Sequence, residues 1–353
     1  MSVELLQRLT EAHGVPGQES AIREIVREEL DGICEISVDY LGSMICLKRA
    51  TKPPKGGAKK LMIAAHMDEI GFVVRYISDK GFLRIHTLGG WDPRMMAAQR
   101  VFVHTAGGAL NGVLMPGVKP KHLLTPAEAN KALTTNDYFV DVGLSAAQAK
   151  RKVKLGDMVT MNRTFQQMGD LYTCKAMDDR CALYVMIEAM KKVKAHSVDV
   201  YAVATVQEEI GLRGATAAGS GIAPDICVAI DITLANDIPG IPEDMAITRL
   251  GHGTAIKFMD SSLICHPKLF DHFVSLAEKH KIPFQIEVLP MGGTDAGGVQ
   301  RQHGGIPSFT LSIPTRYVHT VNETIHKKDL KASVDLISKY IADAHNGKYG
   351  YAR

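Results

Sequence analysis

The stretch Thr205-Val-Gln-Glu-Glu-Ile-Gly-Leu-Arg-Gly214 places two adjacent carboxylates where an apolar run ends. Residues 198–206, which lead into the pair, are rich in β-branched side chains and predict a buried parallel strand. Ligands of open α/β sheets bind at the carboxyl ends of strands, so we expect Glu208 and Glu209 at a binding edge. Neighbouring strand side chains point to opposite faces, which predicts separate roles, one as a metal ligand and one in proton transfer. Viewed alone, a Glu-Glu pair is more commonly a solvated turn.

Two further apolar strands end in polar side chains. Leu61-Met-Ile-Ala-Ala-His-Met-Asp-Glu69 ends in a histidine and two carboxylates, and Pro224-Asp-Ile-Cys-Val-Ala-Ile-Asp231 ends in one carboxylate. Residues two apart on a strand share a face, so Asp68 is expected to approach the His66 ring. A carboxylate there fixes the tautomer and leaves the other ring nitrogen free for a metal. A single histidine after a strand, or a single aspartate such as Asp231, more commonly has a structural explanation.

Two loop segments add further candidates. Lys175-Ala-Met-Asp-Asp-Arg180 precedes a helix predicted to end near Val193, and helix capping alone explains one of its two aspartates, Asp178 or Asp179. Pro314-Thr-Arg-Tyr-Val-His319 follows the last predicted sheet strand, residues 306–313, and ends in a histidine.

The middle of the chain has a different pattern of apolar and polar residues. Residues 71–162 contain short alternating segments separated by glycine-rich turns, with little helical periodicity, and predict a small β domain inserted into an α/β domain. Within it, residues 117–137 contain two prolines and many polar side chains and predict a long loop.

Composition excludes several classes of protein. The chain has 353 residues, enough for two domains, and a net charge of +3 without a basic tract interleaved with aromatics, which argues against nucleic-acid binding. Neither a signal peptide nor an apolar run near the roughly 18 residues of a membrane span is present, so we expect a cytoplasmic protein. Six cysteines without a Cys-x-x-Cys pair argue against a disulfide framework or a thiolate zinc site.

Six side chains fall at strand ends or loop-to-helix junctions that one sheet edge can gather. They are His66, Asp178, Glu208, Glu209, Asp231 and His319. Imidazoles and carboxylates in this number suit a pair of Zn²⁺, Co²⁺ or Mn²⁺ ions, with one glutamate left as general base. Two ions ~3.5–4 Å apart activate water and stabilise the oxyanion of amide hydrolysis.

The sequence resembles the M42 metallo-aminopeptidases, the tetrahedral aminopeptidase group related to leucyl and glutamyl aminopeptidases, nearly from end to end. The resemblance rests on Ala65-His-Met-Asp-Glu69, Gly89-Gly-Trp-Asp92, Lys175-Ala-Met-Asp-Asp-Arg180, Gln207-Glu-Glu-Ile-Gly211, Asp231, Gly292-Gly-Thr-Asp-Ala-Gly297 and Arg316-Tyr-Val-His-Thr320. It implies an α/β fold, with a mixed-sheet α/β/α di-metal peptidase domain formed by residues 1–69 and 163–353. Residues 70–162 would form an inserted, small, β-barrel-like dimerisation domain.

The resemblance also implies a role for each site residue. Asp178 would bridge two divalent ions, Zn²⁺ first among the candidates and Co²⁺ or Mn²⁺ as alternatives. His66 and Asp231 would complete one metal site, and Glu209 and His319 the other. Glu208 would be the general base, Asp68 would orient His66, and the Asp178–Asp179 peptide would be cis. The substrates would be short peptides, and dimers would assemble into a hollow tetrahedral dodecamer.

The preferred side chain of the substrate is less constrained by the sequence. Met291-Gly-Gly-Thr-Asp-Ala-Gly-Gly298 supplies no obvious countercharge, which favours neutral residues, whereas Arg316 and Lys257 would favour acidic residues if they line the pocket. A basic preference also occurs on related scaffolds. Alternative functions are a two-metal deacylase or carboxypeptidase, a non-catalytic peptide-binding scaffold, and a metal-independent glycosidase.

Overall fold

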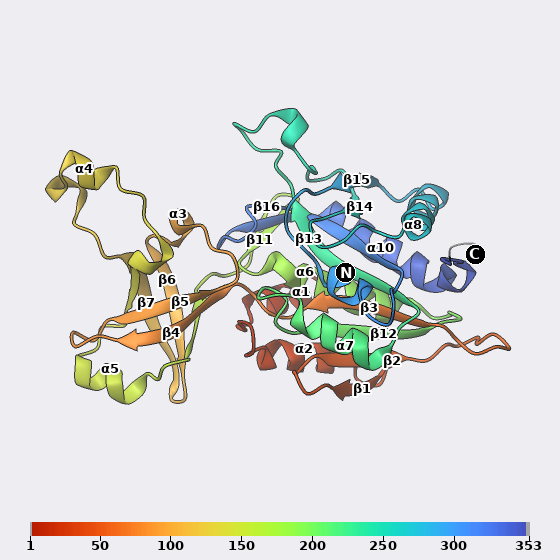
Figure 1. Cartoon of the computed structure of the whole chain (residues 1–353), viewed down its shortest axis with the longest axis horizontal. Helices are drawn as coiled ribbons and strands as arrows, with labels where there is room; N and C mark the ends of the chain where they lie inside the picture. Colours follow the sequence, from red (N-terminus) through yellow and green to blue (C-terminus); the bar gives the residue numbers. More distant parts are fainter. Residues whose placement is uncertain (1, 351–353) are drawn as a thin grey trace.

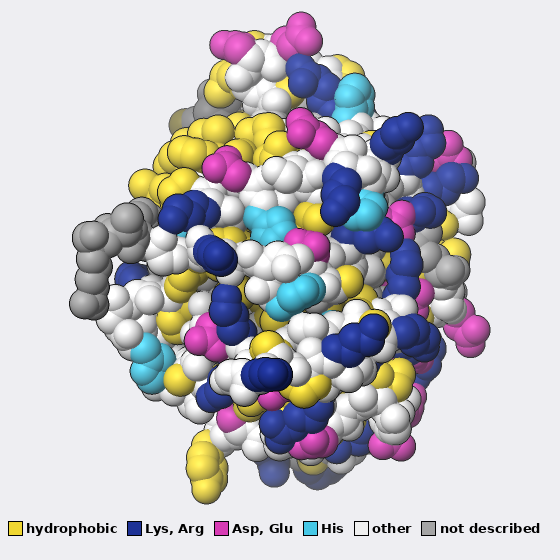
Figure 2. Space-filling model, turned by 90° about the vertical axis from the view of Figure 1, so that its right-hand side faces the viewer, with side chains coloured by type: hydrophobic (Ala, Val, Ile, Leu, Met, Phe, Trp, Pro, Cys, Tyr) yellow, Lys and Arg dark blue, Asp and Glu magenta, His cyan; other side chains and the backbone are white. Residues whose placement is uncertain are grey.

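A computed structural model describes residues 2–350 of the chain, which fold into an open sheet covered by helices and a separate barrel (Figure 1). The open sheet has eleven strands and the barrel has six. In Figure 1 the barrel lies to the left and the open sheet to the right. The face at the open-sheet end carries interspersed basic and acidic side chains (Figure 2).

The open sheet is mixed. Its main path runs β1(Glu35–Val38), β2(Met44–Lys48), β12(Asp199–Thr205), β3(Lys60–His66), β13(Ile226–Leu234), β16(Ser308–Arg316), β17(Glu323–His326), β11(Leu171–Cys174) and β10(Gln166–Met168). In addition, β14(Thr254–Met259) pairs with β16, and β15(Phe284–Val288) pairs with β14. Strands β12, β3, β13 and β16 are parallel, so their carboxyl ends meet at one edge. The predicted parallel strand before Glu208 is therefore confirmed.

Helices cover both faces of this sheet, as the α/β/α prediction requires. One face packs against α1(Val3–Glu11), α2(Ser20–Leu30), α6(Met177–Lys192), α8(Pro267–Lys279) and α10(Lys327–Asp343). The other face packs against α7(Arg213–Ile222) and α9(Asp295–Gln300). In β3, Ile63 faces the first helical layer and Ala64 the second, because strand side chains alternate. Within residues 2–350, no helix combines the length and the apolar composition that a bilayer span requires.

The barrel occupies the interval in which the sequence predicts an inserted β domain. Its strands are β4(Gly71–Ile77), β5(Leu83–Leu88), β6(Gln99–Thr105), β7(Gly108–Pro116), β8(Tyr138–Asp141) and β9(Met158–Met161). Phe72, Val101 and Val140 lie in a hydrophobic core that belongs to the barrel. The helices α3(Pro93–Met96) and α5(Ala146–Lys152) connect its strands. Closure of the barrel gives each of its strands two neighbours within the chain.

The predicted loop at residues 117–137 contains short helices. These are η1(Lys121–Leu123), α4(Pro126–Ala129) and η2(Thr135–Asp137), and the segment projects away from the barrel (Figure 1). The reason lies in local capping: Thr125 and Glu128 form a reciprocal capping box at α4, and Thr134 and Asp137 form another at η2.

A buried ion pair and a hydrogen bond lie where the barrel meets the helices of the open sheet. Lys175 Nζ donates hydrogen bonds to Glu69 Oε2 (2.8 Å) and to the Ala12 carbonyl (2.9 Å). Beside this ion pair, His13 Nδ1 lies 2.9 Å from Thr160 Oγ1 of β9. Burial, followed by the positive charge of Lys175, lowers the pKa of His13 to about 3. The junction therefore favours a neutral His13 ring.

Acidification is expected to weaken this junction through His13. Its pKa falls from an ordinary value of 6.5 to about 3 on folding, so its contribution is present above pH 6.5 and is lost as the pH drops toward 3. Allowing for partial exposure, the unfolding free energy should fall by about 1–2 kcal/mol more between pH 7 and pH 5 in the wild type than in His13→Gln. Urea unfolding at the two pH values measures this difference. Exposed His122→Gln is the control, and an equal pH response in all three proteins would contradict the assignment.

Candidate active site

The six predicted side chains gather at the carboxyl edge of the parallel strands. His66 is the last residue of β3 and pairs in register with Thr205, the last residue of β12, which the Glu208 and Glu209 turn follows. Asp231 lies in β13, which neighbours β3. Two more residues come from outside the parallel strands: Asp178 lies at the amino end of α6, and His319 lies in the loop between β16 and β17. The Asp178–Asp179 peptide is cis, as the resemblance implies.

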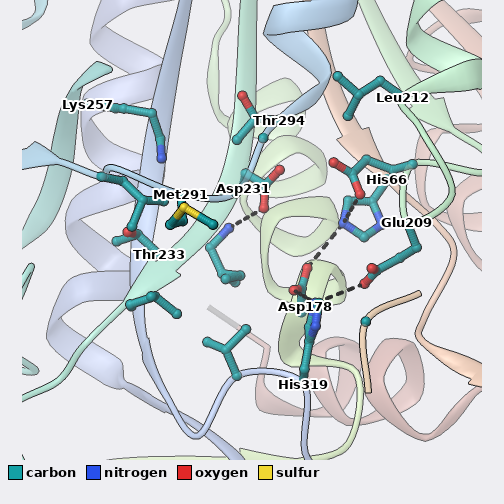
Figure 3. A pocket seen from close by; sticks show the side chains of 18 residues that line it. His66, Asp178, Glu209, Leu212, Asp231, Thr233, Lys257, Met291, Thr294 and His319 are labelled. Carbon is teal, nitrogen blue, oxygen red and sulfur yellow. Dashed lines mark hydrogen bonds and ion pairs between the residues drawn. The ribbon is translucent and has the colours of Figure 1, made fainter. Parts of the chain in front are cut away.

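Asp178 lies between the two imidazole rings (Figure 3). Its Oδ1 is 3.1 Å from His66 Nε2, and its Oδ2 is 3.4 Å from His319 Nε2. Glu209 Oε1 lies 3.5 Å from the same His319 nitrogen, and Glu208 Oε2 lies 3.9 Å from His66 Nε2. Each imidazole therefore faces carboxylates through Nε2.

Three groups of side chains hold their donor atoms within 4.8 Å of one another. The groups are His66 with Asp179 and Asp231, His66 with Glu208 and Glu209, and Asp178 with Glu209 and His319. The resemblance combined His66 and Asp231 with Asp178, whereas the group that contains these two residues also contains Asp179. Asp178 still approaches His66 at 3.1 Å.

Asp68 contacts both the His66 ring and the turn that carries Glu208 and Glu209. The nearest acceptor for His66 Nδ1 is the Asp68 main-chain carbonyl at 2.9 Å, and the carboxylate oxygen is 3.5 Å away. The carboxylate instead accepts the main-chain N–H groups of Glu208 (3.0 Å) and Glu209 (3.1 Å). One residue thereby fixes the tautomer of His66 and the turn that carries both glutamates.

A second buried carboxylate of this kind, Glu323 of β17, was not predicted from the sequence. Its Oε1 accepts the main-chain N–H of His319 (2.8 Å), and its Oε2 accepts that of Asp178 (2.9 Å). Glu323 is the fourth residue after His319, at the start of a short strand, and no periodic pattern marks it. Asp295, in the quoted glycine-rich motif, received no role, yet its buried carboxylate accepts a hydrogen bond from Thr205 Oγ1 (2.5 Å).

The site concentrates negative charge that the protein does not neutralise by itself. Burial, reinforced by other carboxylates, raises the pKa values of Glu208, Asp231 and Asp179 well above their ordinary values, although His66 opposes the shift. Burial alone would raise the pKa of Asp178 too, but hydrogen bonds from His319 and His66 lower it.

This arrangement fits divalent cations. Asp179 Oδ1 is buried and has no hydrogen-bond partner within residues 2–350. An unpartnered buried carboxylate oxygen is unfavourable unless it is protonated or faces a positive charge, and a bound cation would supply that charge. Carboxylate and imidazole donors are the ligands that Zn²⁺, Co²⁺ and Mn²⁺ share.

A cavity of about 460 Å³ opens beside these donors. The donor side chains line one side of it, and Thr233 and Lys257 lie on the other (Figure 3). Lys257 Nζ donates a hydrogen bond to the buried Glu287 carboxylate (2.6 Å). Of the two cations considered from the sequence, Arg316 does not line the cavity and pairs with Asp237 (2.6 Å).

An open mixed sheet with imidazole and carboxylate donors at its carboxyl edge defines the class of metal-dependent α/β/α hydrolases. The family model described as M42 glutamyl aminopeptidase matches residues 42–336. The chain belongs to the M42 peptidase family.

Relatives match the chain over nearly its whole length. A protein of Acetivibrio thermocellus is 39% identical over 96% of this chain and 98% of its own. The lysyl aminopeptidase of Pyrococcus furiosus is 35% identical, covering 94% of each chain.

Solved structures share the fold. Aminopeptidase APDkam598 of Desulfurococcus kamchatkensis has a TM-score of 0.91 and 38% identity, covering 97% of this chain and 94% of its own. The TET1 peptidase of Pyrococcus horikoshii, which can assemble into a tetrahedron or a large octahedral shell, has a TM-score of 0.85 and 32% identity. That match covers 96% of this chain and 98% of the other.

Replacing Glu323 by Gln is expected to weaken divalent-metal binding by about 10–100-fold, because an amide cannot accept both N–H groups that position Asp178 and His319. Titration of chelator-stripped protein with Zn²⁺ measures the change. Asp329→Asn is the matched control, because buried Asp329 also accepts two main-chain N–H groups, from Gly251 and Gly253 (2.7 Å each), and does not line the metal-facing cavity. Equal Zn²⁺ affinity in Glu323→Gln and the control would refute the positioning role.

Proposed function

We propose that this protein is a di-metal aminopeptidase that removes single amino-terminal residues from short peptides. The observation that carries the proposal is the placement of Asp178 between His66 and His319, with Glu208 and Glu209 beside them at the mouth of one cavity. Membership of the M42 family supports the same reaction.

The donor set divides into two metal sites and one base. Asp178 would bridge two divalent ions, Zn²⁺ being the leading candidate and Co²⁺ or Mn²⁺ the alternatives. The remaining ligands would be His66 and Asp231 for one ion, and Glu209 and His319 for the other. When bound, the two ions supply Lewis acidity to the substrate carbonyl and acidify the attacking water.

Glu208 would act as the general base. It lines the cavity and has a raised pKa that suits a group taking up a proton. It accepts a proton from the attacking water as oxygen adds to the carbonyl carbon, and it passes that proton to the leaving amine as the C–N bond breaks. Asp68 holds Glu208 in place through its main-chain N–H.

Recognition of a free amine follows from the same charges. The cavity is lined by the carboxylates of Glu209 and Asp231, beside which the ammonium group of an amino terminus would dock. An acylated amino terminus carries no charge and cannot make this contact, so the site favours free amines.

The cavity favours a neutral substrate side chain. Its lining includes the apolar Leu234, Leu289 and Met291. Lys257, the candidate countercharge for an acidic residue, is buried and already neutralised by Glu287. An acidic residue would have to compete with Glu287 for this cation, and a basic residue would meet its charge. The alternative is a preference for an acidic or a basic amino-terminal side chain in the substrate.

Assembly and location are further parts of the proposal. The chain would form dimers through the barrel, which assemble into a tetrahedral dodecamer, as the shells formed by the TET1 relative suggest. All six cysteines are free thiols and five are buried, which is compatible with the reducing cytoplasm.

The reaction is tested with a panel of aminoacyl p-nitroanilides and N-acetylated counterparts, using chelator-stripped protein with Zn²⁺, Co²⁺ or Mn²⁺ added back. We expect metal-dependent cleavage of free-amine substrates alone. Glu208→Gln should lower kcat by about 10²–10⁴-fold with unchanged metal stoichiometry, because an amide cannot accept the proton. Exposed Glu243→Gln is the control.

Other outcomes separate the rival functions. Full activity in Glu208→Gln would refute its role as general base. Cleavage of acylated substrates would indicate a deacylase, trimming of peptides from the carboxyl end would indicate a carboxypeptidase, and activity that survives chelation would favour metal-independent chemistry. Metal binding without cleavage of any substrate would favour the peptide-binding scaffold.

Side-chain preference is tested by Glu287→Gln, which leaves the Lys257 charge without its 2.6 Å partner. We expect kcat/KM for the glutamyl substrate, relative to the leucyl substrate, to rise about tenfold, which corresponds to ~1.4 kcal/mol. The double variant Lys257→Met with Glu287→Leu removes both charges at similar volume and should keep the wild-type ratio. An unchanged ratio in Glu287→Gln would exclude this pair as the determinant.

A further inference from the structure

A second cavity of about 480 Å³ borders the first. It is lined by residues of the barrel and by residues of the open-sheet unit. Val318 and His319 line both cavities, so the loop that carries the candidate metal ligand His319 is their common wall. On the other side, the second cavity is lined by Asp92, Arg94, Met95 and Gln99, which belong to the barrel segment around α3.

The position of this cavity fits the part of a peptide that follows the scissile bond. An amino-terminal residue whose side chain enters the first cavity presents its carbonyl carbon to the donor cluster. The carbonyl carbon is bonded to Cα on one side and to the leaving nitrogen on the other, so the chain must continue away from the first cavity. The next Cα lies 3.8 Å from the first. The second cavity adjoins the first along Val318 and His319, so it is available to the continuing chain.

The walls of the second cavity are held in fixed positions. Trp91, which precedes α3, stacks on Phe72 of the barrel with ring centroids 4.7 Å apart, and its Nε1–H donates to the Gly71 carbonyl (3.2 Å). On the opposite wall, Tyr317 and His319 both have φ of 60°, and Glu323 accepts the His319 N–H. The cavity is therefore largely formed before a ligand binds.

The chemistry of the walls favours an apolar side chain. Met95 and Tyr317 are 40% and 48% exposed, and with Val318 and Val321 they form an apolar surface. Three polar side chains of the lining already have partners. Arg94 pairs with Asp92 (2.9 Å), while Gln99 donates to the Met95 carbonyl (3.1 Å) and accepts from Arg163 (2.7 Å).

We propose that this second cavity binds the side chain of the residue that follows the scissile bond, and that it selects apolar residues there. The inserted barrel thereby contacts the substrate through α3. This proposal rests on the aminopeptidase function proposed above and adds a second determinant of specificity to it.

The test compares three substrates that share the amino-terminal residue X that wild-type protein cleaves fastest. These are the tripeptides X-Phe-Gly and X-Glu-Gly and the amide of X, whose leaving group is ammonia and has no side chain. Wild-type kcat/KM is expected to be at least about tenfold higher for X-Phe-Gly than for X-Glu-Gly. Met95→Glu should lower the ratio of kcat/KM for X-Phe-Gly to that for the amide by about tenfold or more, whereas Met95→Leu should retain it.

Met115→Glu is the matched control, because Met115 of β7 is exposed to the same extent, 39%, and does not line the cavity. Its ratio should equal that of the wild type. Tyr317→Asn tests the opposite wall and should also lower the ratio. It serves as the second variant if Met95→Glu does not fold, because asparagine tolerates the positive φ of this position.

Two results would overturn the proposal, and they are distinguishable. Equal cleavage of X-Phe-Gly and X-Glu-Gly, or ratios unchanged in both Met95→Glu and Tyr317→Asn, would refute the second cavity while leaving the aminopeptidase intact. Failure of the wild type to cleave the amide and both tripeptides in the presence of metal would refute the proposed function and this inference with it.

Discussion

The burial of several carboxylates at one sheet edge is the constraint on which the rest of this structure depends. Asp178, Asp179, Asp231, Glu208 and Glu209 approach within a few ångströms of two imidazoles, and burial raises the pKa of most of them. An excess of buried negative charge is unfavourable unless cations or N–H donors compensate it. The fold therefore has to supply hydrogen-bond donors to these carboxylates. The negative charge that remains suits a pair of divalent cations.

Main-chain N–H groups supply much of this compensation, and they also fix the geometry. Asp68 accepts the N–H groups of the two glutamates, Glu323 accepts those of Asp178 and His319, and Asp179 accepts that of His66 (3.2 Å). All of these bonds except the one from His319 to Glu323 join segments more than one hundred residues apart in sequence. A loop that slipped by one residue would leave a buried carboxylate without its donor. The metal-facing side chains are thus positioned by a second set of acids.

The elements with strong periodicity could be predicted from the sequence. Residues whose hydrogen-bond partners come together only in the folded chain could not. The strand before Glu208 and the inserted β domain follow from alternation, β-branched residues and glycine-rich turns, whereas the mixed sheet was implied by the family resemblance. His66, Glu208, Glu209 and Asp231 were found because they interrupt apolar runs. Glu323 interrupts no run, and its role arises from two N–H groups that only the folded chain brings to it. The short helices at residues 117–137 were missed because capping boxes act over three residues and leave no periodic pattern.

Charge pairing around the two cavities also bears on which end of a peptide the site can recognise. A carboxypeptidase needs a free cation for the substrate carboxylate. Within residues 2–350, the lysine and arginine side chains that line the two cavities are Lys257 and Arg94. Glu287 neutralises the first and Asp92 the second, and Arg316 is held by Asp237 outside both linings. A substrate carboxylate would have to displace Glu287 or Asp92 to reach either cation. The charge pairing therefore favours trimming from the amino end.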